Sequence, residues 1–468
     1  MTKIKFGTDG WRAIIAQDFT VDNVARVTEA TAKWMLAKEK NPTVVLGHDC
    51  RFAGELFAET SAKVFVAAGI KVFLAKDFIS TPMISLGAVR YKTTLGIIIT
   101  ASHNPPSYNG YKIKGAYGGP LGPDEVQEIE DAIPEKASYN WQSVDLKEAQ
   151  KSGKVEIAHL EDMYIKHVED SFDIKAIKNS NLVLAYDAMY GAGQRVIERL
   201  FPEIYKLHCD NNPGFHGQAP EPIHKNLIEF SDFIKKKGNI SCGLATDGDA
   251  DRIGLYDDKG NFVDSHHIIL LLIHYLVKYK NMSGKVAVAF STTVKIKNMC
   301  DYYELPMEVV KIGFKHICSI MVNEDVLVGG EESGGIAIKG HIPERDGIWM
   351  GLTIWEFMAK TGKSLNDLIQ EVYAITGTFC FDRHDLHITE EIKNKVLQNC
   401  KNGTYKEFGT YKVSRVDDLD GYKFFFDEDT WMMIRASGTE PVLRVYAEAS
   451  NREIVEEILA SAKKVLLG

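Results

Sequence analysis

Residues 44–49 (VVLGHD) and the helical stretch that follows them through residue 65 form the pattern that decides the fold. The same order of apolar run and helical stretch recurs at 182–187 (LVLAYD) and at 286–290 (VAVAF). Continuous rather than alternating apolarity indicates strands that are covered on both faces. Short strands that alternate with helices predict α/β layers with largely parallel sheets. We therefore expect three related α/β domains, with a single larger sheet as the alternative.

The tail from about residue 375 has a different pattern, in which strand-like runs follow one another with helices on either side. The expected strands are 409–416, 422–426, 431–435 and 443–449. This order favours a fourth, α+β domain. The predicted domains are 1–154, 155–257, 258–372 and 373–468.

The composition is that of an ordinary soluble protein, with 45% hydrophobic and 25% charged residues. Lys and Arg number 55 against 64 Asp and Glu, and this acidic balance argues against a nucleic-acid partner. Seven scattered cysteines without a CxxC pair predict reduced thiols. The longest apolar run, 268–273 (IILLLI), is far short of the roughly 20 residues of a membrane span, and no signal peptide is evident. We expect a cytoplasmic protein without a membrane partner.

Residues 100–106 (TASHNPP) follow the apolar run 95–99, so Ser102 lies where a buried strand ends and a loop begins. A serine reacts only with a base, a metal or a good leaving group beside it. His103 and Lys112 are the candidate partners. The alternative is a plain turn in which Ser102 bonds only to backbone.

Residues 246–252 (TDGDADR) alternate three carboxylates, those of Asp247, Asp249 and Asp251, with small residues. In an extended segment these side chains share a face, where they repel each other unless a cation neutralises them. Oxygen ligands favour Mg²⁺ or Ca²⁺. An EF-hand is excluded because Arg252 occupies the position that requires glycine. A solvated acidic turn is the remaining alternative.

Residues 329–335 (GGEESGG) place Glu331 and Ser333 two positions apart, where they can present acceptors to polyol hydroxyls. The glycines permit close backbone approach. A flexible turn is the alternative.

Residues 435–441 (RASGTEP) combine the guanidinium of Arg435 with two hydroxyls and free backbone N–H groups. Such a set suits a phosphate. A plain surface turn is the alternative.

These four loops occur in order, one in each predicted domain, and residues 6–12 (FGTDGWR) precede them. Together they resemble the α-D-phosphohexomutase family, particularly prokaryotic phosphoglucomutase/phosphomannomutase enzymes. The resemblance implies four domains around a central cleft, three of them α/β and the C-terminal one α+β. It also implies an isomerase of carbohydrate metabolism that interconverts hexose 1-phosphate and hexose 6-phosphate.

The resemblance assigns a role to each loop. Ser102 would be the phosphoserine, and Mg²⁺ would be bound by Ser102, Asp247, Asp249 and Asp251. The transferring phosphoryl group would be surrounded by Arg12, His103, Lys112 and Arg252. Sugar hydroxyls would be held by Glu331 and Ser333. The non-reacting phosphate would be clamped by Arg435, Ser437, Gly438 and Thr439.

Lys112 is the candidate general base, because a buried lysine beside cations can have a lowered pKa. A hexose 1,6-bisphosphate would be the intermediate and activator. The only partners expected are small hexose phosphates, and the choice between monomer and homodimer stays open.

Glucose is the expected sugar and mannose the next, because Glu332 stands where the glucosamine-phosphate branch typically has Gln. Gly335 departs from the His found in several members, which leaves the sugar selectivity open. Glucosamine-phosphate mutase is the alternative. A metal-dependent sugar phosphatase and a non-catalytic sugar-phosphate sensor are the rival functions.

Overall fold

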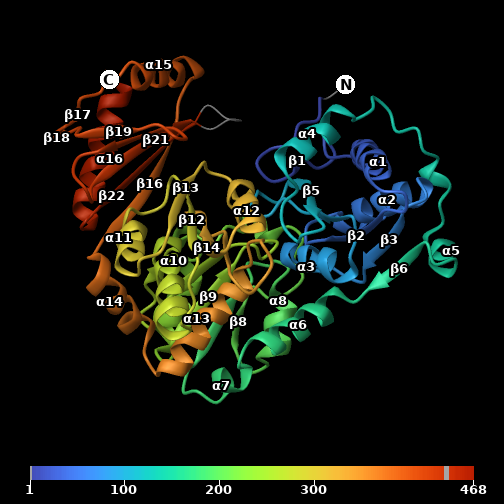
Figure 1. The fold of residues 1–468 in the computed structure, drawn as a ribbon, viewed down its shortest axis with the longest axis horizontal. Coiled ribbons are helices and arrows are strands. Elements are labelled where there is room, and N and C mark those ends of the chain that lie inside the picture. The colour runs from blue at the N-terminus through green and yellow to red at the C-terminus, as the bar shows by residue number, and fades with distance from the viewer. Residues whose placement is uncertain (1–2, 437–441) are drawn as a thin grey trace. The chain divides into compact units, whose positions relative to one another are not determined.

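The computed structural model describes residues 3–436 and 442–468 (Figure 1). The chain divides into two compact units. The first unit comprises Met1–Lys285 and Gly313–Leu368, and the second comprises Val286–Ile312 and Ile369–Gly468. The four domain boundaries expected from the sequence stay a prediction.

The first unit opens with a six-stranded mixed sheet. In spatial order its strands are β1 (Trp11–Ile14), β5 (Tyr108–Gly115), β4 (Leu95–Ile99), β2 (Thr43–His48), β3 (Lys71–Ala75) and β6 (Val155–Ala158). Strands β4, β2, β3 and β6 pair in parallel, whereas β5 is antiparallel to both of its neighbours. All five residues of β4 are buried, as the continuous apolar run predicted.

Five helices accompany this sheet: α1 (Val21–Lys38), α2 (Gly54–Ala67), α3 (Thr81–Tyr91), α4 (Pro123–Asp131) and α5 (Leu146–Lys151). Helix α2 packs on β2 and β3, and α3 packs on β2, β4 and β5. Helix α1 begins where the Thr20 side chain accepts a hydrogen bond from the Asn23 backbone N–H, and α3 begins at Ser80 in the same way. Such caps satisfy N–H groups that a helix end leaves free.

A second, five-stranded mixed sheet follows in the first unit. Its strands in spatial order are β11 (Phe262–Val263), β10 (Ile253–Tyr256), β9 (Cys242–Thr246), β7 (Leu184–Asp187) and β8 (Tyr205–Leu207). The helices of this region are α6 (Leu160–Ser171), α7 (Ile174–Lys178), α8 (Gln194–Leu200), α9 (Ile228–Lys237), α10 (Ser265–His274) and α13 (Gly347–Thr361). Helix α13 packs on β9 and β10, the two strands on either side of the loop that contains Asp247, Asp249 and Asp251.

An antiparallel hairpin completes the first unit. It consists of β14 (Val326–Gly330) and β15 (Ile336–Ile338), and α12 (Phe314–Asn323) packs on β14. Short 3₁₀ turns lie at Trp141–Ser143, Phe215–Gly217 and His224–Asn226, and a π-helical turn lies at Tyr275–Tyr279.

The second unit carries the parallel pair β12 (Lys285–Ala289) and β13 (Met307–Val310) and a five-stranded antiparallel sheet. In spatial order that sheet contains β16 (Cys380–His387), β22 (Val442–Ala449), β21 (Trp431–Ala436), β20 (Tyr422–Phe425) and β19 (Arg415–Asp417). The remaining elements are α11 (Lys295–Tyr302), α14 (Leu365–Thr376), α15 (Glu390–Lys401), α16 (Arg452–Leu467) and the ribbon of β17 (Glu407–Phe408) and β18 (Tyr411–Lys412).

The predicted fold class is confirmed: α/β layers with mixed, largely parallel sheets precede a C-terminal α+β region. Three of the four strands predicted in the tail correspond to β20, β21 and β22, whereas 409–416 is divided between β18 and β19. The long edge strand β16 was missed, because its exposed face carries charged residues that hide the strand pattern. The central cleft stays a prediction.

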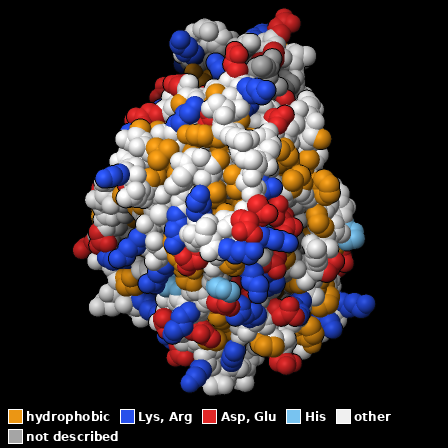
Figure 2. Space-filling model, turned by 90° about the vertical axis from the view of Figure 1, so that its right-hand side faces the viewer, with side chains coloured by type: hydrophobic (Ala, Val, Ile, Leu, Met, Phe, Trp, Pro, Cys, Tyr) orange, Lys and Arg blue, Asp and Glu red, His pale blue; other side chains and the backbone are white. Residues whose placement is uncertain are grey.

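Two further properties are the distribution of surface charge and the apolarity of the helices. Figure 2 shows Lys and Arg side chains interspersed with Asp and Glu over the viewed face. Within residues 3–436 and 442–468, no helix has the length and apolarity to cross a membrane.

A cluster of buried hydrophobic residues forms the core of the second unit. Ile434 of β21 is fully buried in a cluster with Phe424, Leu443 and Ile458. Ile434→Ala should lower the free energy of unfolding of this unit by about 2–5 kcal/mol, because it leaves a cavity. Hydrogen exchange of peptides from β20 and β22 during urea unfolding measures this loss. Val416→Ala, at an exposed position of β19, should change it by less than about 0.5 kcal/mol. Equal effects of the two substitutions would contradict the assigned core.

Candidate functional site

Three loops of the first unit begin where a strand ends, and they carry the candidate residues. Ser102 follows β4, the three aspartates follow β9, and Glu331 follows β14. The first two loops touch at Gly248, where a Cβ would lie 2.5 Å from the carbonyl oxygen of Ser102. Only glycine permits this approach without a shift of backbone. The fold therefore brings together residues that are about 145 positions apart.

Ser102 is buried and held in a left-handed backbone conformation, with φ of 53°. Its Oγ donates a hydrogen bond to Oδ2 of Asp247 at 2.6 Å and lies 3.3 Å from Nδ1 of His103. Its backbone N–H donates to Oγ1 of Thr100 at 2.9 Å. The plain-turn alternative is wrong, because the Ser102 hydroxyl bonds to a carboxylate from another segment. Non-glycine residues in this conformation concentrate at functional sites.

Arg51 is a residue of this site that sequence reasoning missed. Its buried guanidinium donates to the carbonyl oxygens of the serine loop, namely those of Ser102 (2.5 Å), Asn104 (2.7 Å), Pro105 (2.9 Å) and Tyr108 (3.1 Å). Its Nε lies 3.4 Å from Oδ2 of Asp49. Arg51 thereby fixes the shape of the loop. Its sequence signal is its place after β2, which corresponds to the place of Ser102 after β4.

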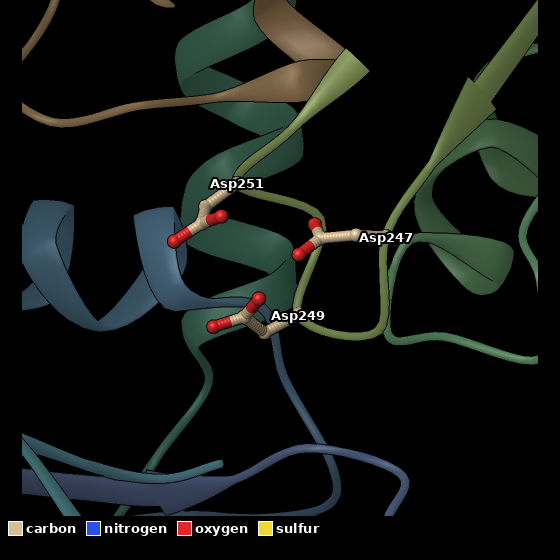
Figure 3. A group of neighbouring side chains, drawn as sticks. All are labelled: Asp247, Asp249 and Asp251. Carbon is tan, nitrogen blue, oxygen red and sulfur yellow. The ribbon is translucent and has the colours of Figure 1, made fainter. Parts of the chain in front are cut away.

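Asp247, Asp249 and Asp251 converge on one space between β9 and β10 (Figure 3). All three are fully buried, and one oxygen from each lies within 4.8 Å of the others. Burial raises the pKa of Asp247 well above its ordinary value, and the charges of the other two carboxylates raise it further. The solvated-turn alternative is therefore wrong.

The donor set fits a hard divalent cation. Among the described residues, Oδ1 of Asp249 and Oδ1 of Asp251 have no hydrogen-bond partner although both atoms are buried. Each Oδ2 atom is occupied: Asp249 accepts from Lys112 at 2.8 Å and Thr81 at 2.5 Å, and Asp251 accepts from Lys112 at 3.0 Å. Unpaired buried carboxylate oxygens are costly unless an ion binds them. Oxygen-only ligands of this kind suit Mg²⁺.

Lys112 is buried as expected, but the expected lowering of its pKa is wrong. Its Nζ lies 2.9 Å from Asp9, 2.8 Å from Asp249 and 3.0 Å from Asp251. Burial lowers the pKa of Lys112, yet the three carboxylates outweigh it and raise that pKa above its ordinary value. The sequence identified Lys112 as a candidate base, but it could not predict that the neighbours of this lysine are carboxylates. Lys112 is therefore a fixed cation in this arrangement.

Positive charge gathers around His103. Burial lowers the pKa of His103 well below its ordinary value, and nearby Arg252, Arg12, Lys112 and Arg51 lower it further. Nη1 of Arg12 donates to Oδ1 of Asn104 at 2.7 Å, and the backbone N–H of Arg252 donates to Oδ1 of Asp247 at 3.0 Å. A buried hydroxyl beside several cations is suited to an anion such as a phosphoryl group.

Glu331 and Ser333 lie in the tight turn between β14 and β15. Oε1 of Glu331 accepts from the Gly313 backbone N–H at 2.8 Å, and burial raises the pKa of this carboxyl to about 7. The turn adjoins the aspartate loop, because Arg252 forms a β-bridge with Gly335. The turn with the predicted sugar-binding residues therefore adjoins the loop with the predicted metal ligands.

Arg435 belongs to the second unit and lies near the end of β21. It pairs with Asp420 at 3.4 Å, and Asp420 also accepts from the Ile312 backbone N–H at 2.9 Å. Ser437, Gly438 and Thr439 lie outside the described residues. The phosphate clamp therefore stays a prediction.

Models of one family match most of the chain. The phosphoglucomutase/phosphomannomutase family has three alpha/beta/alpha domains, whose models match residues 3–140, 162–260 and 264–375. The model of its C-terminal domain matches residues 393–465.

Whole-length relatives occur among archaeal proteins. A phosphoglucomutase/phosphomannomutase of Thermococcus kodakarensis is 27% identical over 98% of this chain and 98% of its own length. A probable phosphoglucosamine mutase of Pyrococcus furiosus is 30% identical over 98% of this chain and 96% of its own length. The two relatives carry different sugar names, so the likeness establishes the family and not the sugar.

Solved structures agree with this assignment. A crystal structure described as a putative phosphomannomutase from Thermus thermophilus has a TM-score of 0.86 and 32% identity and covers 100% of both chains. A phosphoglucomutase/phosphomannomutase family protein from Burkholderia thailandensis, 20% identical with a TM-score of 0.76, shares the fold. With four family domains matched in order, this chain belongs to the phosphoglucomutase/phosphomannomutase family of α-D-phosphohexomutases.

Proposed function

We propose that this chain interconverts hexose 1-phosphates and hexose 6-phosphates through a phosphorylated Ser102. The observation that carries the proposal is the contact between Oγ of Ser102 and Oδ2 of Asp247 at 2.6 Å, beside two carboxylate oxygens without partners in the described chain. A sugar-phosphate sensor needs neither a buried serine nor a cation site. The membership of the chain in a family of mutases supports catalysis over binding alone.

Asp247, Asp249 and Asp251, with an oxygen of phospho-Ser102, would hold Mg²⁺. When bound, Mg²⁺ supplies positive charge that polarises the phosphoryl oxygens. Side chains of the first unit would position the transferring phosphoryl group. Arg12 and Arg252 would hold the equatorial phosphoryl oxygens, because both lie beside His103 at the serine loop. Phosphoryl transfer depends mainly on such positioning and charge.

In the first half-reaction a sugar hydroxyl attacks the phosphorus of phospho-Ser102. A bond from the sugar oxygen to phosphorus forms as the bond from phosphorus to Ser102 Oγ breaks. The hydroxyl proton passes to a base, and Ser102 Oγ takes up a proton. Neutral His103, with Nδ1 at 3.3 Å from Ser102 Oγ, is placed to exchange a proton with that oxygen, whereas Lys112 is held by three carboxylates. The sugar then carries two phosphates.

In the second half-reaction the bisphosphate would turn around and return its other phosphoryl group to Ser102. Glu331 and Ser333 would bind the sugar hydroxyls in both orientations. Arg435, with Ser437, Gly438 and Thr439, would hold whichever phosphate is not reacting. A single clamp that accepts either end explains why hexose 1,6-bisphosphate would serve as both intermediate and activator.

We propose glucose phosphate as the main substrate and mannose phosphate as the next. Glu332, in the middle of the sugar-binding turn, supports this choice from the sequence. A second candidate is glucosamine phosphate, favoured by the name of the Pyrococcus furiosus relative and by that of a Methanococcus maripaludis phosphoglucosamine mutase, 28% identical over 89% of this chain.

Ser102→Ala should abolish mutase turnover, because it removes the oxygen that carries the phosphoryl group. Intact-protein mass spectrometry of the wild type should show a fraction with one phosphoryl group, mapped to Ser102 by peptide analysis. Ser143→Ala, at an exposed turn, is the control and should leave both readouts unchanged. Full activity in the Ser102 variant would refute the role of this serine.

Asp249→Asn should raise the Mg²⁺ concentration needed for activity or remove activity, because it removes a charge from the cation site. A titration of Mg²⁺ in a coupled assay measures the requirement, and a titration of Mn²⁺ without substrate measures binding directly. Asp258→Asn alters an exposed carboxylate outside the cluster and should titrate like the wild type. An unchanged binding curve for Asp249→Asn would disprove the metal site.

Parallel kinetics with glucose, mannose and glucosamine 1-phosphates should give the highest kcat/KM with glucose 1-phosphate, with little release of inorganic phosphate. Preference for the glucosamine substrate would select the second candidate. Stoichiometric release of phosphate without isomerisation would select the phosphatase.

A further inference from the structure

Arg345 lies in the segment between β15 and α13 and is buried in the first unit. Its Nη2 forms a close ion pair with Oδ2 of Asp9 and lies 3.0 Å from Oδ2 of Asp251. Its Nε lies 3.2 Å from Oε1 of Glu344, and its guanidinium lies 5.3 Å from the centre of the Phe314 ring. The phosphoryl-transfer steps leave this arginine without a role, although it touches one of the three clustered aspartates.

Arg345 closes a ring of alternating charges. Lys112 contacts Asp251 at 3.0 Å and Asp9 at 2.9 Å, and Arg345 contacts the same two carboxylates from its own side. Each of the two acids therefore lies between two cations. Without Arg345, Asp9 would still form ion pairs with Lys112 and with Lys114, which lies at 3.4 Å. Asp251 would form an ion pair with Lys112 alone among the described residues. Nη2 of Arg345 contacts Oδ2 of both carboxylates, so Arg345 and Lys112 together restrain these two oxygens.

The restraint matters for the other oxygen of Asp251. Both cations of the ring contact Oδ2, whereas Oδ1 is buried and has no hydrogen-bond partner in the described chain. The ring thus leaves one defined oxygen of Asp251 available to a cation. Residues that hydrogen-bond to metal ligands and orient them typically lower metal affinity by about 10–100-fold when they are removed.

Gly335 provides an independent observation on the same arginine. A Cβ at this position would lie 2.6 Å from Cδ of Arg345 and 3.1 Å from Cγ. The middle of the arginine side chain therefore runs through the space that a side chain at position 335 would fill. Because the guanidinium is held at two carboxylates, the stem cannot move without pulling on those ion pairs. Gly335→Ala should displace the guanidinium without changing the charge of the site.

We propose that Arg345 is a positioning residue of this enzyme, which orients Asp251 so that its free oxygen faces the cation site. Gly335 is the residue that makes room for it. The proposal rests on the proposed function, since it takes the three aspartates to bind a divalent cation. It adds a determinant of metal affinity that comes from the segment preceding α13 and from the sugar-binding turn.

The test measures Mn²⁺ binding to the full-length protein without substrate, by electron paramagnetic resonance of free Mn²⁺. Arg345→Met should weaken binding by about 10–100-fold. Arg345→Lys should restore part of it, because a point charge can pair with one of the two carboxylates. Gly335→Ala should weaken binding although every charge is kept. Arg195→Met is the control, because Arg195 pairs with Asp77 and Glu161, outside the cluster.

The outcomes separate the two proposals. Wild-type Mn²⁺ affinity in folded Arg345→Lys and Gly335→Ala overturns the positioning role, even if thermal stability falls. A purely structural role would lower the unfolding midpoint and leave affinity in the folded protein unchanged. If Asp249→Asn weakens Mn²⁺ binding and neither Arg345→Lys nor Gly335→Ala does, only the inference about Arg345 fails. If Asp249→Asn also binds normally, the metal site itself fails.

Discussion

The first unit depends on the neutralisation of four carboxylates, those of Asp9, Asp247, Asp249 and Asp251, at one place. An isolated carboxylate in such a position would take up a proton rather than stay charged. Lys112 and Arg345 pair with Asp9 and Asp251, and Lys112 also pairs with Asp249. Asp247 has instead a hydroxyl and a backbone N–H as partners, and its pKa is raised. The carboxylates are therefore only partly neutralised by side chains, which is compatible with the proposed binding of a divalent cation.

The loops are stiffened where this charge is concentrated. Four carbonyl oxygens at the serine loop accept hydrogen bonds from Arg51, so a buried side chain adds to the turn hydrogen bonds that the loop makes within itself. Gly248 lets the aspartate loop approach Ser102, and the β-bridge from Arg252 to Gly335 joins the turn between β14 and β15 to the aspartate loop. These contacts join the three loops to one another, and under the proposed function they would contribute to phosphoryl transfer by positioning its groups.

What could be predicted from the sequence was what is local. The strands at 43–48 and 95–99 could be predicted because each is marked by a run of apolar residues only a few positions long. Ser102 and the three aspartates could be predicted because each lies in a short motif. The partners of Arg345 could not be predicted, because Asp9 is 336 positions away. The pKa of Lys112 could not be predicted either: its direction depends on whether acids or bases surround the lysine, and the fold decides this. Strand β16 was missed because its pairing with β22 compensates for a polar pattern.

The same contacts decide how Lys112 and a metal ion can share two aspartates. If both needed the same oxygens, a bound cation would expel the lysine, and the ring with Arg345 would open. The structure separates them, since Lys112 contacts Oδ2 of Asp249 and Asp251 whereas Oδ1 of each has no partner in the described chain. A divalent cation at the Oδ1 atoms would therefore add to the lysine rather than replace it. Because opposite charges attract, a bound cation and Lys112 would both favour a dianionic phosphoryl group over a neutral ligand. Under the proposed function, the arrangement of oxygens on two aspartates would link metal binding to a preference for phosphate.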